Sequence, residues 1–255
     1  MTGAMEIGLV GVGPWGKHIL RDLCTLGARV HTVARSPESI GRARTGGAAS
    51  VVDDPDLLPR SCAGYVVANR TISHLDAVEA LLPRGRPIFV EKPLAPDLER
   101  IEQLPPEAHQ LVFIMHKWRY HPGVIELARI ARSRTYGAPL GLRTYRAGWG
   151  NPHDDVRALW ILAPHDFSIA LAVLGEVPRV VSAAADAIGA GDGAIAQLRT
   201  RAGLPVTMEL SAAHPTSLRR ILLRCRDAVC QLDSADYGAV TVKHIDSGRS
   251  ETIRV

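Results

Sequence analysis

Short apolar runs alternate with helical stretches over the first 116 residues. The runs are rich in β-branched residues and include EIGLVGVG at 6–13, GYVVA at 64–68 and QLVFIM at 110–115. Between two such runs, SHLDAVEALL carries apolar residues at helical spacing, with Ser73 as its expected N-cap. Another helix is expected to begin near Pro14. Strands and helices that alternate in this way predict βαβ units and a parallel sheet.

The pattern changes after residue 117. The sequence predicts a helix over 123–133, a strand over 141–148, an irregular loop and a helix that begins near Asp166. From residue 179 onward, several alternating strands follow one another with tight turns and no helix between them, which favours an antiparallel sheet. We therefore predict an α/β fold with a Rossmann domain over 1–117 and an α+β domain over 118–255.

Composition excludes several classes of protein. The chain has 255 residues, of which 46% are hydrophobic and 22% charged, so disorder over most of its length is excluded. The longest apolar stretch, 167–175, is shorter than the roughly 20 residues that span a bilayer. The first residues lack the basic start and apolar core of a signal peptide. We expect a cytoplasmic protein that does not enter the membrane.

Charge and cysteine content say less about the function. Lys and Arg number 30 against 26 Asp and Glu, but the basic residues are scattered and only 5% of residues are aromatic, so a nucleic-acid partner is not expected. The four cysteines form no CxxC pair and are expected to be core thiols. Cys225 and Cys230 flank a predicted hairpin turn, and a disulfide between them stays an alternative despite its rarity in the cytosol.

A GxGxxG motif follows the first predicted strand. Gly11, Gly13 and Gly16 occupy its glycine positions, between that strand and the first predicted helix. In this context the first glycine turns the chain, the second admits a pyrophosphate and the third lets helix and strand pack closely. The motif predicts a dinucleotide site; the alternative is a turn that only packs the helix on the strand.

The end of the second predicted strand bears on the choice of cofactor. An NAD-type site carries Asp or Glu about 20 residues after the glycines, for the ribose 2′-hydroxyl. This chain has Ala34, Arg35 and Ser36 there. An arginine and a hydroxyl bind a 2′-phosphate, so we predict a preference for NADP(H), with NAD as the second choice. The alternative is that Arg35 is a solvated loop residue.

A Glu-Lys-Pro sequence ends the fifth predicted strand. Glu91, Lys92 and Pro93 lie at the carboxyl edge, where ligands of parallel sheets bind. The proline ends the strand and turns the lysine toward the cleft. Burial lowers the pKa of a lysine, which suits it to proton transfer.

These motifs together resemble the Gfo/Idh/MocA family, the relatives of glucose–fructose oxidoreductase and inositol dehydrogenase. The resemblance includes RYHP at 119–122 and LAPHDFSIALAVLG at 162–175, and is nearest to the branch that acts on nucleotide-linked sugars. It implies a Rossmann domain followed by an open-faced sheet domain, which pairs into a homodimer or homotetramer. It further implies hydride transfer between a nicotinamide and a secondary alcohol or ketone of a sugar, nucleotide sugar or cyclitol.

The resemblance also implies roles for individual residues. Those around the cofactor are Gly11, Gly13, Pro14, Trp15 and Gly16 at the pyrophosphate, Ala68, Asn69 and His74 along its path, and Glu91, Lys92 and a cis Pro93 at the nicotinamide. Those near the substrate are His116, Arg119, Trp160 and His165, of which His165 is an acid–base or orienting residue.

Three departures from the family pattern affect these roles. Ile161 stands where many relatives carry an Asp that orients His165, so Lys92 becomes the principal general acid–base, with Asp155 or Asp166 as substitutes for that Asp. Asn69 is followed by Arg where relatives have Thr-Pro. The sequence ends sooner than most relatives, before their C-terminal helical segment.

Two other readings stay open. A non-catalytic nicotinamide-binding sensor would explain Ile161, and a reductase of a non-sugar ketone or an imine would use the same motifs. The stretch 153–166 is rich in His and Asp, but its spacing fits no helix-borne metal pair, so no metal is expected.

Overall fold

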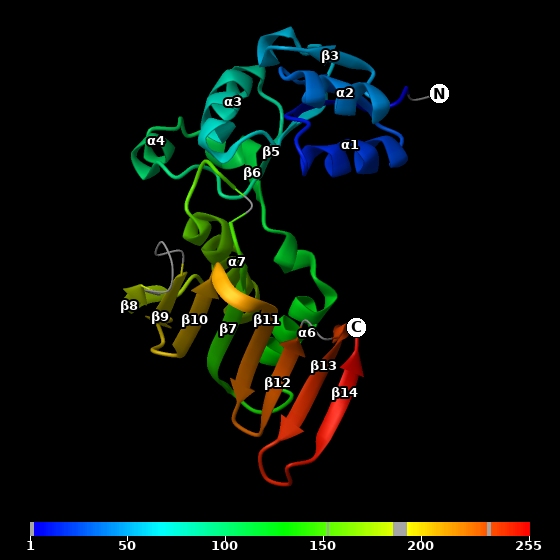
Figure 1. The fold of residues 1–255 in the computed structure, drawn as a ribbon. Helices are drawn as coiled ribbons and strands as arrows, with labels where there is room; N and C mark the ends of the chain where they lie inside the picture. Colours follow the sequence, from blue (N-terminus) through cyan, green and yellow to red (C-terminus); the bar gives the residue numbers. More distant parts are fainter. Residues whose placement is uncertain (1–2, 152, 186–192, 234–235) are drawn as a thin grey trace. The chain divides into compact units, whose positions relative to one another are not determined.

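The computed structural model describes residues 3–151, 153–185, 193–233 and 236–255. The chain divides into an N-terminal unit, Met1–Met115, and a C-terminal unit, His116–Val255, two residues before the predicted boundary. One unit has a parallel sheet and the other a mixed sheet with its own helices, which confirms the predicted fold class (Figure 1).

All strands of the N-terminal sheet are parallel, in the order β3-β2-β1-β4-β5-β6. The strand order reverses direction between β1 and β4, and in such sheets ligands bind outside the carboxyl ends at this switch point. The strands are β1 (Glu6–Val10), β2 (Arg29–Val33), β3 (Ser50–Val52), β4 (Gly64–Val67), β5 (Ile88–Glu91) and β6 (Val112–Met115).

Helices cover both faces of this sheet because successive strand residues point to opposite sides. In β1, Leu9 packs in the cluster that holds Leu20, and Val10 packs in the cluster that holds Val78. The central strands therefore lack a polar face, as expected for a buried parallel sheet. The helices are α1 (Gly16–Thr25), α2 (Pro37–Thr45), α3 (His74–Leu81), α4 (Leu98–Glu102) and α5 (Ala108–Leu111).

Two local expectations in this unit need correction. Helix α1 begins at Gly16 rather than near Pro14, with Trp15 at its N-cap. Ser73 does stand at the N-cap of α3, but its side chain makes no capping hydrogen bond. A 3₁₀ turn at Thr71–Ser73 leads into α3, which gives Ser73 a backbone conformation outside the extended region typical of capping serines.

The C-terminal sheet has the order β14-β13-β12-β11-β7-β10-β9-β8. Among the described strands of this sheet, only β7 and β10 pair in parallel, because the chain crosses over through a helix after β7; the other pairs are antiparallel. The strands are β7 (Pro139–Trp149), β8 (Arg179–Ala185), β9 (Gly193–Arg199), β10 (Pro205–Ser211), β11 (Ala213–Cys225), β12 (Ala228–Asp233), β13 (Asp236–His244) and β14 (Ser250–Arg254). Predicted strand residues 186–188 lie outside the described residues.

Helices α6 (Pro122–Ser133) and α7 (Ala158–Leu174) pack on one face of this sheet and share its core. The predicted start of α7 near Asp166 was wrong, because the apolar residues before Pro164 already continue the helix. Pro164 sits inside α7 although it has no N–H to donate to the preceding turn. No helix in the described part of the chain is long and apolar enough to cross a membrane.

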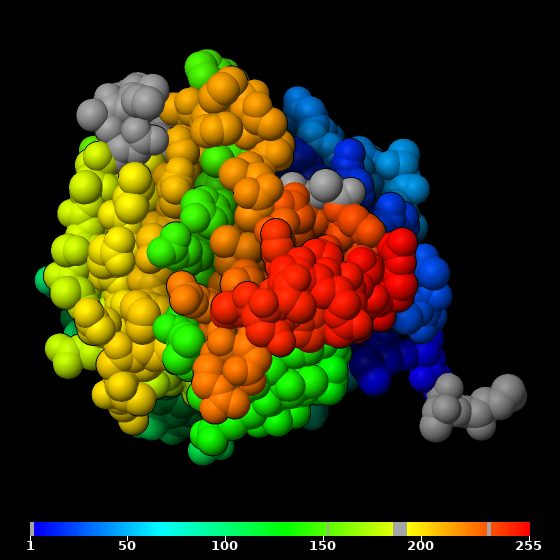
Figure 2. Space-filling model, turned by 90° about the horizontal axis from the view of Figure 1, so that it is seen from below, coloured from blue at the N-terminus to red at the C-terminus, as the bar shows by residue number. Residues whose placement is uncertain are grey.

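The edge of the C-terminal sheet is strongly exposed. In Figure 2 its strands spread across the surface from β8 and β9 in yellow to β13 and β14 in red. Every residue of β8 is exposed, including Val180 and Val181. Association of copies of the chain through this sheet stays a prediction.

Core packing in the C-terminal unit predicts a strong contrast between two isoleucines. Ile169 of α7 is fully buried, whereas Ile125 of α6 is 51% exposed. Replacing a buried isoleucine by alanine removes apolar contacts and leaves a cavity, so Ile169→Ala should lower the free energy of unfolding by about 2–5 kcal/mol. Ile125→Ala should change it by less than about 1 kcal/mol. Urea unfolding followed by circular dichroism measures both, and equal losses would contradict this packing.

Candidate active site

The glycine loop after β1 combines tight packing with open space. Gly11 has φ of 95°, and a Cβ there would lie 2.5 Å from the Asn69 Cα atom. A Cβ on Gly16 would lie 2.1 Å from the Gly11 carbonyl oxygen. A Cβ on Gly13 would meet no atom within 4 Å. Backbone packing therefore requires the first and third glycines, while the bare backbone of Gly13 fits a group that binds from outside, such as a pyrophosphate.

The end of β4 lies against this loop. The Ala68 amide donates to the Val10 carbonyl at 2.8 Å, and Asn69 lies directly beside Gly11. The side-chain nitrogen Nδ2 of Asn69 donates to the Ser73 carbonyl oxygen at 3.0 Å. Its Oδ1 is buried and has no hydrogen-bond partner among the described atoms. A buried acceptor of this kind costs free energy unless a ligand satisfies it, so Asn69 fits the predicted cofactor path.

The Glu-Lys-Pro corner is tied to the glycine loop. The Trp15 indole N–H donates to Glu91 Oε1, and the Lys92 amide donates to Glu91 Oε2 at 3.2 Å. Lys92 is half-buried, and its peptide bond to Pro93 is cis, in agreement with the expectation. These bonds place Lys92 at the carboxyl end of β5, beside the loop that is predicted to hold the cofactor.

His74 lies between the end of β4 and the Glu-Lys-Pro corner. Its side chain is only 2% exposed. Its Nδ1 lies 2.8 Å from the Pro93 carbonyl oxygen and its Nε2 lies 3.1 Å from the Asn69 carbonyl oxygen. Both partners are carbonyl oxygens; a neutral imidazole has one N–H and donates to one of them, and only a protonated ring donates to both. We predicted that His74 would line the cofactor path; the geometry gives it a positioning role for Asn69 and Pro93.

The end of β2 presents the predicted phosphate ligands at the start of α2. Ser36 is the N-cap of α2, and its hydroxyl accepts a hydrogen bond from the Ser39 amide at 3.2 Å. Arg35 is exposed and is anchored through Nε to the Asp53 carbonyl at 2.7 Å. Arg42 approaches from α2 and donates to the Val12 carbonyl at 3.2 Å. Arg35 and the N-terminus of α2 thus lie together after β2, while Arg42, in the last turn of α2, bonds the glycine loop.

A cavity of about 760 Å³ lies within the C-terminal unit. His165 of α7 lines it and is 8% exposed, with Ile161 one turn earlier on the same wall. The predicted substrate residues His116, Arg119 and Trp160 are not among its described lining residues. Those are Lys117, Trp118, Arg146, Gly148, Trp149, Gly150, Asn151, Ala158, Ile161, Leu162, His165, Ser211, Ala212, Ser217, Arg219 and Tyr237.

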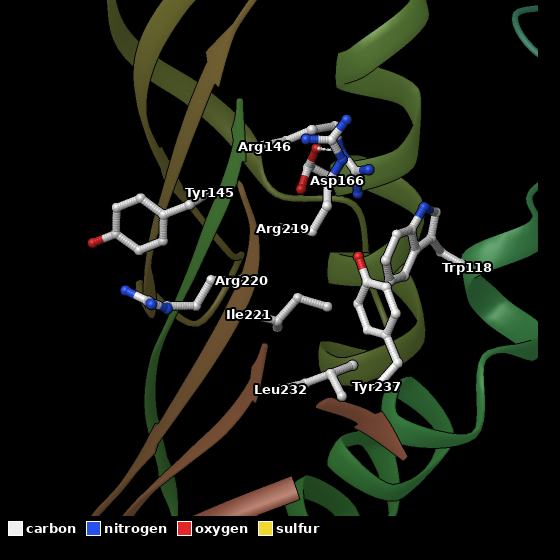
Figure 3. Close-up of a pocket in the computed structure, with 9 residues that line it drawn as sticks. All are labelled: Trp118, Tyr145, Arg146, Asp166, Arg219, Arg220, Ile221, Leu232 and Tyr237. Atoms are coloured by element: carbon white, nitrogen blue, oxygen red, sulfur yellow. Dashed lines mark hydrogen bonds and ion pairs between the residues drawn. The ribbon is translucent and has the colours of Figure 1, made fainter. Parts of the chain in front are cut away.

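A buried ion pair lies beside this cavity: Arg146 lines it, and Arg146 and Asp166 both line a narrower pocket that shares part of its wall (Figure 3). Arg146 Nε donates to Asp166 Oδ2 at 2.6 Å, with the two side chains 5% and 1% exposed. The Arg146 guanidinium also lies 4.8 Å from the Trp118 ring centroid, within the range of a cation–π contact. Burial raises the pKa of Asp166, and the charge of Arg146 opposes that shift.

Our sequence reasoning missed Arg146 and Arg219 as site residues, although the alternation of the strands held a signal for both. Residues an even number of positions apart in a strand point to the same face of the sheet. Arg146 is therefore on the same face of β7 as the buried Leu142, and Arg219 is on the same face of β11 as the buried Ile221. An arginine on a buried strand face needs a partner or a ligand.

The described residues contain no group of three or more His, Cys, Asp or Glu side chains placed to hold a metal ion. In the His- and Asp-rich stretch, Asp166 is bound to Arg146, and Asp155 Oδ1 lies 3.9 Å from His153 Nδ1. Both carboxylates therefore interact with other side chains of the protein.

The two cysteines of the predicted hairpin are neighbours in the core. Cys225 and Cys230 are both fully buried free thiols. A hydrogen bond with Cys225, together with burial, raises the pKa of the Cys230 thiol. Because the thiolate is the reactive form, this environment favours structural thiols.

The sequence of the N-terminal unit matches a known protein family. Residues 5–114 match the sequence model of the Gfo/Idh/MocA family, described as an oxidoreductase family with an NAD-binding Rossmann fold. The N-terminal unit belongs to this family. The match covers the glycine loop, the end of β4 and the Glu91–Lys92 corner, so the family assignment and the site geometry concern the same residues.

Individual relatives extend the likeness to the C-terminal unit. The chain is 30% identical over 193 residues to inositol 2-dehydrogenase 2 of Saccharopolyspora erythraea, covering 71% of this chain but only 56% of that protein. The structure resembles UDP-N-acetylglucosamine 3-dehydrogenase GnnA from Acidithiobacillus ferrooxidans, with a TM-score of 0.82, 21% identity and coverage of 99% and 83% of the two chains. It also resembles levoglucosan dehydrogenase in complex with NADH and levoglucosan, with a TM-score of 0.85, 16% identity and coverage of 99% and 80%. At these identities the two structural matches establish the fold.

The glycine loop generates a test that separates binding from folding. Because a Cβ at Gly13 meets no protein atom, Gly13→Ala should leave the thermal midpoint unchanged. The methyl group would obstruct the pyrophosphate, so the dissociation constant for a nicotinamide dinucleotide should rise at least about tenfold. Gly41→Ala, at another unobstructed glycine, serves as the control. Unchanged affinity in Gly13→Ala would show that the loop has only a packing role.

Proposed function

We propose that this protein is a nicotinamide-dependent oxidoreductase that acts on a secondary alcohol or ketone of a sugar, nucleotide sugar or cyclitol, and that it prefers NADP(H). Membership of an NAD-binding oxidoreductase family supports the cofactor class. The similarity to an inositol 2-dehydrogenase supports a polyol as the substrate class. When bound, the nicotinamide would supply the hydride chemistry.

The observation that carries the proposal is the connection between Lys92 and the cofactor loop. Trp15 of that loop bonds Glu91, the residue before Lys92, and His74 bonds the carbonyl of Pro93, the residue after it. Lys92 is therefore fixed from both sides at the carboxyl edge of the sheet. A structural lysine would not need such support, because its long side chain ordinarily extends into water.

Lys92 performs the proton transfer in this proposal. As the carbinol carbon becomes a carbonyl, the Lys92 amine accepts the proton that leaves the substrate hydroxyl; in the reverse direction it returns that proton. Positioned general acid–base groups of this kind contribute about 10²- to 10⁴-fold to rate.

His165 has a different role in our proposal. It lines the cavity and is 8% exposed, with Ile161 one turn before it on α7. An imidazole in a cavity wall can hydrogen-bond a substrate hydroxyl. We therefore assign His165 to orienting that hydroxyl, with Lys92 as the principal proton relay.

The cofactor preference is tested by titration. NADPH should bind more tightly than NADH, because Arg35 and the N-terminus of α2 favour a 2′-phosphate. Arg35→Ala should raise the dissociation constant of NADPH about tenfold or more and leave that of NADH nearly unchanged. Arg44→Ala, an exposed arginine in the last turn of α2, is the matched control. Nicotinamide fluorescence measures all six dissociation constants, two cofactors with each of the three proteins; tighter binding of NADH by the unmodified protein would refute the preference.

The catalytic role is tested with Lys92→Met. With a substrate found among myo-inositol, levoglucosan and UDP-N-acetylglucosamine, kcat should fall about 10²- to 10⁴-fold, while cofactor affinity changes less than about threefold. Lys243→Met, an exposed lysine of β13, should change neither. Turnover that survives in Lys92→Met would exclude the lysine as the acid–base. Cofactor binding without turnover on any alcohol or ketone would favour the sensor function instead.

A further inference from the structure

Aromatic side chains gather on the wall of the C-terminal cavity. The chain has only four tryptophans and five tyrosines, yet Trp118, Trp149 and Tyr237 all line this one cavity. They come from three separate elements, the 3₁₀ turn η4 (Lys117–Tyr120), the end of β7 and the start of β13. Aromatic rings combined with a few polar groups are typical of walls that bind small organic ligands.

Trp149 has the position of a platform for such a ligand. Its side chain is 80% exposed, although burial of an aromatic ring ordinarily stabilises a protein strongly. Glycines flank it on both sides. A Cβ on Gly150 would meet no atom within 4 Å, and one on Gly148 would meet only the tip of the Arg219 side chain, at 3.9 Å. The backbone around Trp149 therefore leaves room for a ligand beside its ring.

Trp118 brings an unused hydrogen-bond donor to the same cavity. Its side chain is 8% exposed, and its indole nitrogen is buried without a hydrogen-bond partner among the described residues. The Arg146 guanidinium lies 4.8 Å from its ring centroid, and the His121 ring stacks on it at 5.2 Å between centroids, so packing fixes the indole in place. A buried N–H without an acceptor costs free energy and is rare in native proteins. An acceptor that enters with a ligand would remove this cost.

Tyr237 supplies a second polar group beside Trp118. The two ring centroids are 5.8 Å apart, with an angle of 73° between the ring planes. Figure 3 shows the Tyr237 hydroxyl and the Trp118 nitrogen at the upper ends of their rings. Burial raises the pKa of Tyr237, so its hydroxyl keeps the proton and can donate as well as accept. A sugar hydroxyl has the same dual capacity.

We propose that these three side chains form an aromatic subsite for the ring of a neutral polyol, a pyranose or a cyclitol. Trp149 stacks on the C–H face of the ring, and Tyr237 and Trp118 bind one of its oxygens. Tyr237 is 38% exposed and meets that oxygen first, and a shift of its ring uncovers the Trp118 N–H. This inference rests on the proposed function and narrows its substrate class to a ring that is recognised without a nucleotide.

Binding of four probes to the full chain tests the ring preference. Myo-inositol and levoglucosan present a fixed C–H face, D-sorbitol carries its hydroxyls on an open chain, and UDP presents a nucleobase. Calorimetric titration, with and without NADP⁺, should show at least one of the two rings binding about tenfold or more tightly than D-sorbitol, because ordering an open chain costs entropy. Binding of neither ring would overturn the inference. UDP binding that depends on Trp149 would also overturn it, since the platform would then take a base.

Trp149→Ala tests the platform. It should weaken binding of the preferred ring about tenfold or more, because the stacking surface is lost. Leu140→Ala is the control: this exposed residue lies at the start of the same strand, outside the described lining of the cavity, and its loss should leave the affinity unchanged. Equal affinity in Trp149→Ala and the unmodified protein would contradict the proposal.

Tyr237→Phe isolates the hydrogen bond, because it removes only the hydroxyl and leaves the ring contact with Trp118. Affinity for the preferred ring should fall about three- to tenfold, while the thermal midpoint stays the same. Tyr120→Phe, at a tyrosine that is 62% exposed and outside the described lining, should change neither. If Tyr237→Phe binds the ring as tightly as the unmodified protein does, the subsite is wrong.

These outcomes are distinct from those of the proposed function. If cofactor titration and Lys92→Met behave as proposed but the Trp149 and Tyr237 variants bind the ring normally, only the subsite fails. Conversely, if the ring binds through Trp149 and Tyr237 while neither nicotinamide dinucleotide binds, the subsite stands and the oxidoreductase proposal fails.

Discussion

The ion pair between Arg146 and Asp166 is the interaction on which the C-terminal unit depends. It joins α7 to β7 in an environment where each charge would be costly alone. Losing one partner of such a pair ordinarily costs about 3–5 kcal/mol, because the other charge stays buried. Asp166 is also next to His165, so the bond that holds Asp166 against the sheet fixes the rotation of the helix that presents His165 to the cavity.

Backbone contacts play the corresponding part in the N-terminal unit. The loop after β1 approaches the end of β4 so closely that only glycine fits at Gly11 and Gly16. Side chains then extend the connection to the end of β5, through the Trp15–Glu91 bond and through the two backbone contacts of His74. Three strand ends are thereby held together, and Lys92 takes its place from them rather than from its own flexible side chain.

The two units contribute different chemistry to the proposed reaction. The N-terminal unit supplies the general features of the family, a dinucleotide loop and a supported lysine. The C-terminal cavity carries what distinguishes this chain, because Ile161 replaces a common carboxylate and two arginines face each other across neighbouring strands. Substrate choice depends on such differences, since a site built to hydrogen-bond a substrate rejects ligands that lack the matching group.

The sequence by itself determined the features that depend on local order. Strand–helix alternation predicted the fold, and the GxGxxG spacing and the Glu91–Lys92–Pro93 corner predicted a tight loop after β1 and a turn after β5, because periodicity and turn chemistry involve residues close together in the chain. The start of α7 was predicted too late in the chain, near Asp166, because a proline inside a helix is not expected from sequence alone. In the structure α7 continues through Pro164. Only the tertiary structure decided that His74 contacts two loops and that Arg219 faces Arg146. These contacts arise from strand register and from the packing of α3 on the N-terminal sheet. They join residues that no regular spacing in the sequence connects.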